Sequence, residues 1–332
     1  MTKDSDELQD IDLLLEESRA HRFSDPERVV YLAELARAAA DRLQVSVHGR
    51  AAVADTRAKV WTELANAYRL SDELDRAEEA LGRAVRHFEE GSRHPDLLAR
   101  IVDRFATLLC YRRRFDEALA LLDRLASFYL ARGDRHLAGR TLVTRGLYTE
   151  NAGEALRAIE FTRRGLELID PARDPHLLLA GVHNLLWCAS ALGRYALIER
   201  LVPRVRFLYG DDRLNVLRLE WVEARAAFGL GRGEEAERLY EKVRAGFADA
   251  GLIFPTSLVS LELALVWLSR GRTSEVALLA GELATAFQGL KVGREVIVSL
   301  LLLRRAIEEG RALDELEGRI RSLAISIRSL ER

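Results

Sequence analysis

The side chains whose types and spacing could do chemistry in this sequence are polar residues at helical intervals, and the chemistry they offer is binding. Lys59, Asn66 and Arg69 are spaced by seven and three residues, which places them on one face of a helix. An asparagine amide can both donate to and accept from an extended peptide backbone. An arginine can bind a carboxylate through two parallel hydrogen bonds. These three residues form the first candidate contact with a partner.

The same positions recur in later helices when they are counted from a small residue near the middle of each one. They select further candidate partner-binding residues: Arg100, Asp103, Arg140, Arg218, Trp221 and Arg225. A tryptophan flanked by arginines is typical of the energetic centre of a protein interface. In the helix that precedes Trp221, the same count selects Leu178, Gly181, Leu185 and Cys188.

The last such helix presents only leucines at these positions: Leu258, Leu261, Leu265 and Leu268. Four leucines in a row are too apolar to face water. Three alternatives follow. The C-terminal helices or a tighter superhelix could cover the row, a partner helix could bind it, or a second copy of the chain could pair through it as a homodimer.

Catalytic and metal-binding alternatives find little support. The motifs G-x-S-x-G, G-x-x-x-x-G-K-[ST], H-E-x-x-H and G-x-G-x-x-G do not occur. The seven histidines fall mostly in turns, and none has another histidine at i+4 to form a helical zinc site. His183 precedes Cys188 by five residues, which misses the i+4 face that a base and its thiol would share. We therefore expect no enzyme, no cofactor and no metal.

Charge and composition narrow the partner class. Fifty basic and 52 acidic side chains give a net charge of -2, so no global attraction to nucleic acid or an anionic membrane is expected. The densest basic stretch, YRRRF at 111–115, could bind phosphate or form a solvated turn, and the adjacent Asp116 and Glu117 favour the turn. The N-terminus is acidic and no apolar stretch is long enough to cross a bilayer, which predicts a cytoplasmic protein.

Helical periodicity runs along nearly the whole chain, with short and long polar breaks in alternation. This pattern predicts helical hairpins. A small or β-branched residue early in each second helix recurs at intervals of 38 to 41 residues: Ala77, Ala118, Ala158, Ala196, Ala236 and Val276. Each first helix has its own small residue: Ala65, Ala106, Gly146, Asn184, Ala224 and Ala264. Small residues allow the two helices of a hairpin to pack closely.

The clearest unit resembles the tetratricopeptide repeat in six residues: Trp61, Leu64, Ala65, Tyr68, Ala77 and Leu81. The resemblance implies an all-α, right-handed α-solenoid of about eight antiparallel helical hairpins. We expect one array over 1–332, with an N-terminal hairpin in 1–48, six recognisable repeats in 58–290 and a C-terminal hairpin or cap in 293–332. The residue patterns of several units also resemble those of repeat arrays in bacterial regulatory proteins.

In arrays of this kind the first helices line the concave surface, which gives the candidate residues their function. The resemblance implies a non-catalytic scaffold that binds a protein or peptide. The alternative is a regulator that senses a ligand or signalling peptide and closes on its effector. The carboxylate clamp of chaperone-binding tetratricopeptide domains has a lysine one turn before the asparagine, where this sequence has Thr62. C-terminal peptide capture is therefore not expected.

Overall fold

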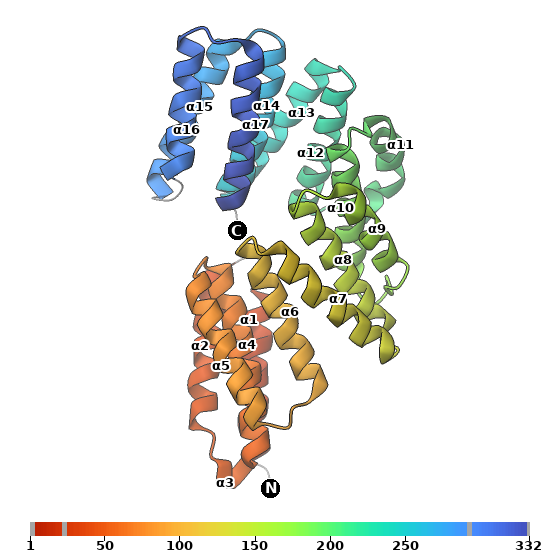
Figure 1. The fold of residues 1–332 in the computed structure, drawn as a ribbon, viewed down its shortest axis with the longest axis vertical. Coiled ribbons are helices and arrows are strands. Elements are labelled where there is room, and N and C mark those ends of the chain that lie inside the picture. The colour runs from red at the N-terminus through yellow and green to blue at the C-terminus, as the bar shows by residue number, and fades with distance from the viewer. Residues whose placement is uncertain (1–3, 22–24, 291–293, 331–332) are drawn as a thin grey trace. The chain divides into compact units, whose positions relative to one another are not determined.

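The computed structural model describes residues 4–21, 25–290 and 294–330, in which every regular element is a helix (Figure 1). Contacts between Cα atoms divide the chain into two compact units, Met1–Asp174 and Pro175–Arg332, which we call the first and second units. The described part of the first unit contains α1 (Asp4–Ala20), α2 (Pro26–Arg42), α3 (Val45–His48), α4 (Arg50–Leu70), α5 (Leu74–Glu90), α6 (Pro95–Tyr111), α7 (Phe115–Ala131), α8 (Arg135–Asn151) and α9 (Ala155–Leu166).

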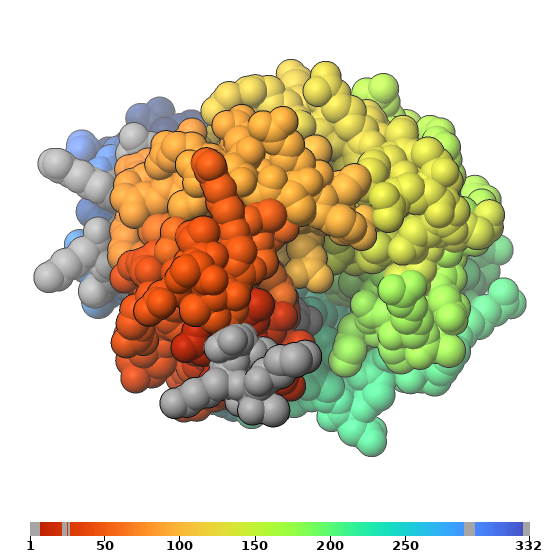
Figure 2. Space-filling view, turned by 90° about the horizontal axis from the view of Figure 1, so that it is seen from below, coloured from red at the N-terminus to blue at the C-terminus, as the bar shows by residue number. Residues whose placement is uncertain are grey.

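The described part of the second unit contains α10 (Pro175–Ala191), α11 (Tyr195–Val205), the 3-10 helix η1 (Arg206–Tyr209), α12 (Arg213–Gly229), α13 (Gly233–Asp249), α14 (Ile253–Ser269), α15 (Thr273–Leu290), α16 (Arg294–Glu308) and α17 (Leu313–Leu330). Apart from α3 and η1, the helices form eight consecutive pairs, which confirms the all-α class and the expected number of hairpins. In the first unit the hairpins lie against one another in chain order, from red to yellow (Figure 2). The single array over 1–332 and its three segments stay a prediction.

One turn motif closes seven of the hairpins and fixes the repeat. The chain enters the left-handed region once in each of these turns, at Asp72, Arg113, Gly153, Gly193, Gly231, Gly271 and Gly310. The amide of the next residue then donates back to a carbonyl five residues earlier, as from Glu73 to Tyr68 at 2.9 Å and from Arg272 to Trp267 at 2.9 Å. This bond satisfies a carbonyl that the end of the first helix would leave unpaired.

Small residues permit the close packing that the sequence predicts. A Cβ added at Gly146 would lie 2.0 Å from Thr162 Oγ1. Gly139 and Gly165 face each other, and a Cβ on either one would lie 2.7 Å from the carbonyl oxygen of the other. The backbones of α8 and α9 therefore touch directly, which larger residues would prevent.

The hairpin α10–α11 departs from the predicted register. Ala196 is exposed, so its assignment as the packing residue of α11 is wrong. Ile198 is fully buried instead, and it lies five residues after the left-handed Gly193, as Ala158 lies five after Gly153. The matching first-helix residue is the buried Leu186 rather than Asn184. Large residues replace the small pair in this hairpin, so a search for small residues slipped by two positions.

The leucine row of α14 lies inside the second unit. Leu258, Leu261 and Leu268 are buried and Leu265 packs against the same core. Helix α17 packs on α14 and brings apolar residues at helical spacing into this core: Leu316, Ile320, Leu323 and Ile327. The possible homodimer through this row is therefore corrected to an internal contact, because the leucines that would pair are already covered by the C-terminal helix.

Candidate functional site

Charged side chains link four helices of the first unit in a chain of ion pairs that we call the polar ladder: Arg19, Glu63, Arg104, Asp103 and Arg140. Glu63 on α4, only 7% exposed, lies 3.2 Å from Arg19 of α1 and 3.8 Å from Arg104 of α6. Asp103 on α6 lies 3.1 Å from Arg104 and 3.6 Å from Arg140 of α8. The predicted residues Asp103 and Arg140 are thus brought together, and the ladder joins consecutive hairpins.

Lys59 is held by an ion pair with Asp12 of α1, so its charge is already balanced. Thr62 is buried and its hydroxyl donates to the carbonyl of Ala58 at 2.6 Å. A side chain engaged with its own helix cannot reach a peptide carboxylate. The position that the clamp lysine would occupy therefore holds a threonine whose hydroxyl is buried and already hydrogen-bonded.

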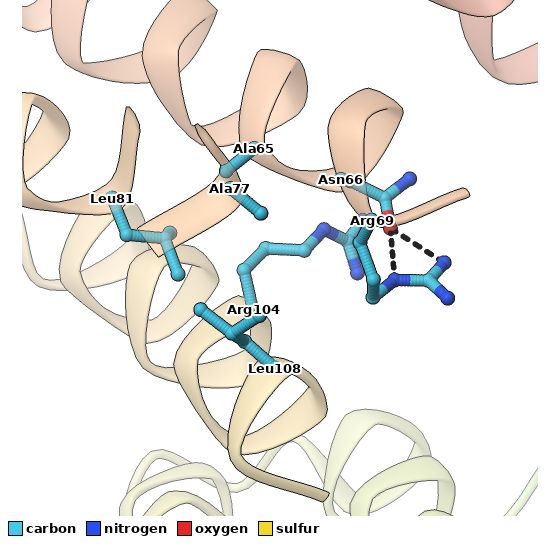
Figure 3. A pocket seen from close by; sticks show the side chains of 7 residues that line it. All are labelled: Ala65, Asn66, Arg69, Ala77, Leu81, Arg104 and Leu108. Carbon is cyan, nitrogen blue, oxygen red and sulfur yellow. Dashed lines mark hydrogen bonds between the residues drawn. The ribbon is translucent and has the colours of Figure 1, made fainter. Parts of the chain in front are cut away.

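Asn66 and Arg69 lie beside each other at the mouth of a crevice between α4, α5 and α6 (Figure 3). The amide oxygen of Asn66 accepts from Arg69 Nη2 at 2.9 Å, and the drawn amide nitrogen points away from Arg69. The Arg69 guanidinium also lies 4.6 Å from the ring centre of Tyr111 on α6. The crevice itself is too narrow to admit a water molecule, so a partner would contact these side chains from outside it.

Two arginines of the first unit remain open to a partner. Arg100 on α6 is exposed, and it makes no ion pair or hydrogen bond with the part of the chain that the structure describes. Arg140 is 39% exposed and shares Asp103 with Arg104. Both therefore present donors that an incoming carboxylate or backbone carbonyl could take without unburying a charge.

In the second unit, Trp221 is the centre of an aromatic cluster rather than an exposed contact. Its indole N–H donates to Glu262 on α14 at 2.7 Å, and its ring meets Trp187 edge-to-face at 4.9 Å. Arg225 stacks on Trp187 at 4.3 Å and pairs with Glu262 at 3.6 Å. Arg218 is exposed and donates to Asn215 at 3.2 Å. The predicted trio thus divides into a buried centre, a half-buried stacking arginine and an exposed arginine.

Sequence reasoning missed His183 and Trp187 because of the two-residue slip in α10. The count from Asn184 selected Leu178, Gly181, Leu185 and Cys188 instead. Gly181 and Cys188 are buried, and Leu178 and Leu185 are half-buried. Counting from Leu186 selects His183 and Trp187, which stack on each other at 6.2 Å. Gly193, forty residues after Gly153, was the sequence signal that fixes the register.

His183 is half-buried beside Trp187 and Tyr209, a setting that disfavours its charged form. Its Nδ1 lies 3.2 Å from the Tyr209 hydroxyl. Burial, with a smaller effect from the charge of Arg218, lowers the pKa of His183 to about 4. The imidazole is therefore neutral near pH 7.

No protein-family model matches this sequence, and no curated protein matches it. Solved structures do match in fold. A Rap protein complexed with competence and sporulation factor superposes with a TM-score of 0.69 at 9% identity, over 97% of this chain and 88% of that one. The apo form of RapI gives 0.61 at 14% identity, over 79% and 92%. A tetratricopeptide repeat protein from Parabacteroides merdae gives 0.53 at 16% identity, over 90% and 99%.

The chain has a tetratricopeptide-like fold. The resemblance that rested on the residues from Trp61 to Leu81 is thereby confirmed at the level of fold, and at these identities the likeness extends no further. In this fold the first helix of each hairpin carries the residues described above, and the second helix packs behind it.

The densest basic stretch of this tetratricopeptide-like chain makes contacts within the fold. The YRRRF turn is engaged by acidic neighbours: Arg112 contacts Glu78 at 3.1 Å, and Arg114 contacts Glu117 at 2.6 Å. Among the described residues, no three His, Cys, Asp or Glu side chains come together as a metal site would require. Within the same residues, no helix has the length and apolar character needed to cross a membrane.

Proposed function

We propose that this tetratricopeptide-like chain is a non-catalytic regulatory component that binds a protein or peptide along the first helices of its first unit. One observation carries the proposal: Asn66, Arg69, Arg100 and Arg140 lie on consecutive first helices, on rigid elements that the polar ladder ties together. Helices held together in this way need little rearrangement on binding, which favours affinity. A bacterial, cytoplasmic setting forms part of the proposal.

The fold likeness supports the peptide reading in particular. The Rap protein with a TM-score of 0.69 was solved in complex with competence and sporulation factor. A protein of this fold can therefore form a complex with such a factor, and we extend the capacity to bind a partner to this chain as a sensing regulator. The open arginines, with the asparagine amide beside them, suit an extended segment that carries acidic groups.

Co-purification from the native host followed by measured affinities tests this proposal. We expect a specific partner whose dissociation constant rises about tenfold or more in the Arg100→Ala and Arg140→Ala variants, since each loses a charge-assisted hydrogen bond. Arg157→Ala is the matched control, because Arg157 is an exposed arginine on the second helix α9. Equal affinities for all three variants, or the absence of any specific partner that binds at micromolar concentrations, would refute the proposal.

A further inference from the structure

A cleft of about 420 Å³ lies on the hairpin α12–α13 of the second unit, and none of the candidate partner-binding residues lines it. Its floor is apolar, from Val216, Leu217, Ala245 and Gly246. The floor is sealed tightly, since a Cβ at Gly246 would lie 2.5 Å from Leu217 Cδ1. Charged residues form the walls: Asp211, Arg213, Glu220, Lys242 and Asp249.

The sequence explains why the cleft occurs at this hairpin. The second helices α5, α7 and α13 each run for 17 residues, whereas α9 runs for 12 and α11 for 11, and α11 ends just after Pro203. Proline removes a helical hydrogen bond and favours such an ending. The chain then turns through η1 to Asp211 and enters α12, so the turns that α11 lacks are those nearest the start of α12.

Glu220 is the unusual wall residue. It is only 7% exposed, and one of its carboxylate oxygens accepts from Lys242 Nζ at 2.5 Å. The other oxygen, Oε2, is buried and has no hydrogen-bond partner within the described residues. A buried carboxylate oxygen without a donor is costly, so a ligand donor that the carboxylate turns to meet would be favourable.

The remaining charges indicate the sign of that ligand. Arg213 is occupied by Asp249 at 2.7 Å, and Lys242 by Glu220. Asp211 is exposed and makes no ion pair with the described residues. Both helix ends beside the cleft are capped: Asp212 accepts from the amide of Asn215 at the start of α12, and the carbonyls of Gly246, Phe247 and Ala248 accept from amides that follow α13. Within the described lining, three acidic residues stand against two basic ones, and the buried side-chain atom without a partner is an acceptor.

We propose that this cleft binds a small alkyl amine, with the ammonium group on Glu220 and the methylene chain running along the apolar floor towards Asp211. An amine supplies the donors that Glu220 lacks, and its stem matches the aliphatic lining. The site is separate from the partner-binding residues of the first unit, so this inference goes beyond the proposed function.

Calorimetric titration of the full chain with 1,5-diaminopentane tests the site, with 1,5-pentanediol as the uncharged ligand of equal length. We expect saturable binding of the diamine with a dissociation constant below about 1 mM, and none of the diol. Glu220→Gln should weaken binding at least tenfold. Lys242→Met should strengthen it, because it removes the cation that competes for Glu220.

Glu282→Gln is the matched control, since Glu282 is an exposed carboxylate on α15 that pairs with Arg244. This variant should bind the diamine as the wild type does, and circular dichroism should show that all variants stay folded. If Glu220→Gln fails to fold, the opposite sign expected for Lys242→Met still decides the matter. Absence of saturable binding, equal binding of the diol, or weaker binding by Lys242→Met would overturn the proposal.

Discussion

The contact between α8 and α9 gives a stability prediction that contrasts a tightly packed glycine with an open one. Gly139→Ala adds a methyl group 2.7 Å from the carbonyl oxygen of Gly165 and 3.0 Å from the backbone nitrogen of Ile169. Backbone atoms cannot rotate away as a side chain can, so the two helices must separate. Gly82→Ala, in the middle of α5, adds the same group where no atom lies within 4 Å.

Two opposing effects set the magnitude. Overpacking costs about 1–3 kcal/mol, and alanine gains about 1 kcal/mol over glycine in a helix. Because the clash at Gly139 is with backbone, we take the upper part of that range and expect a net loss of about 1–2 kcal/mol. At Gly82 only the helix propensity acts, so we expect a gain of about 0.5–1 kcal/mol.

Urea denaturation followed by far-ultraviolet circular dichroism measures both variants against the wild type. The midpoint should fall for Gly139→Ala and rise for Gly82→Ala, with the slope unchanged in each case. For a unit of this size, Tm should move by about 2–4 °C per kcal/mol. A Gly139→Ala protein as stable as the wild type would refute the close packing of α8 on α9.

Two further predictions concern single residues. Arg113 holds a left-handed φ of 58° in the α6–α7 turn. Arg113→Gly should therefore stabilise the chain by about 0.5 kcal/mol in urea denaturation, whereas Arg113→Ala should not. Equal stability of the two variants would contradict backbone strain at this residue. The pKa of His183 is about 4 in the folded chain, whereas its ordinary value is 6.5. The unfolded chain therefore binds more protons between these pH values, so stability falls as the pH drops from 6.5 to 4. Relative to a His183→Gln variant, this loss should reach at most about 3 kcal/mol, and parallel pH profiles of the two proteins would contradict the burial of His183.

The sequence predicts the fold well wherever one local cause decides it. In the first unit, small residues, turn residues and helical spacing all indicate the same register, so Ala65, Ala106 and Gly146 are correctly placed. In α10–α11 the small pair is absent, and Leu186 and Ile198 take its place. The regular turn at Gly193 was the better guide there, because backbone conformation does not depend on the size of the packing residues.

The candidate site was less predictable because it depends on partners distant in sequence. Asp12 and Arg19 of α1 decide how Lys59 and Glu63 are engaged, and no spacing within α4 indicates either contact. In the same way, the cover of the leucine row by α17 depends on a helix about fifty residues further along the chain. Helical position predicts which side a residue faces, whereas its freedom to bind a ligand is set by tertiary contacts.

Photo-cross-linking tests the central claim, that a partner binds along the first helices, most directly. A benzophenone side chain would replace Leu147, an exposed residue seven positions after Arg140 on the same face of the first helix α8, and Ala120 or Arg157 as exposed positions on the second helices α7 and α9. The proposed function predicts a cross-linked product with the co-purified partner at 147, and none at 120 and 157. Cross-links at 120 and 157 alone would contradict it.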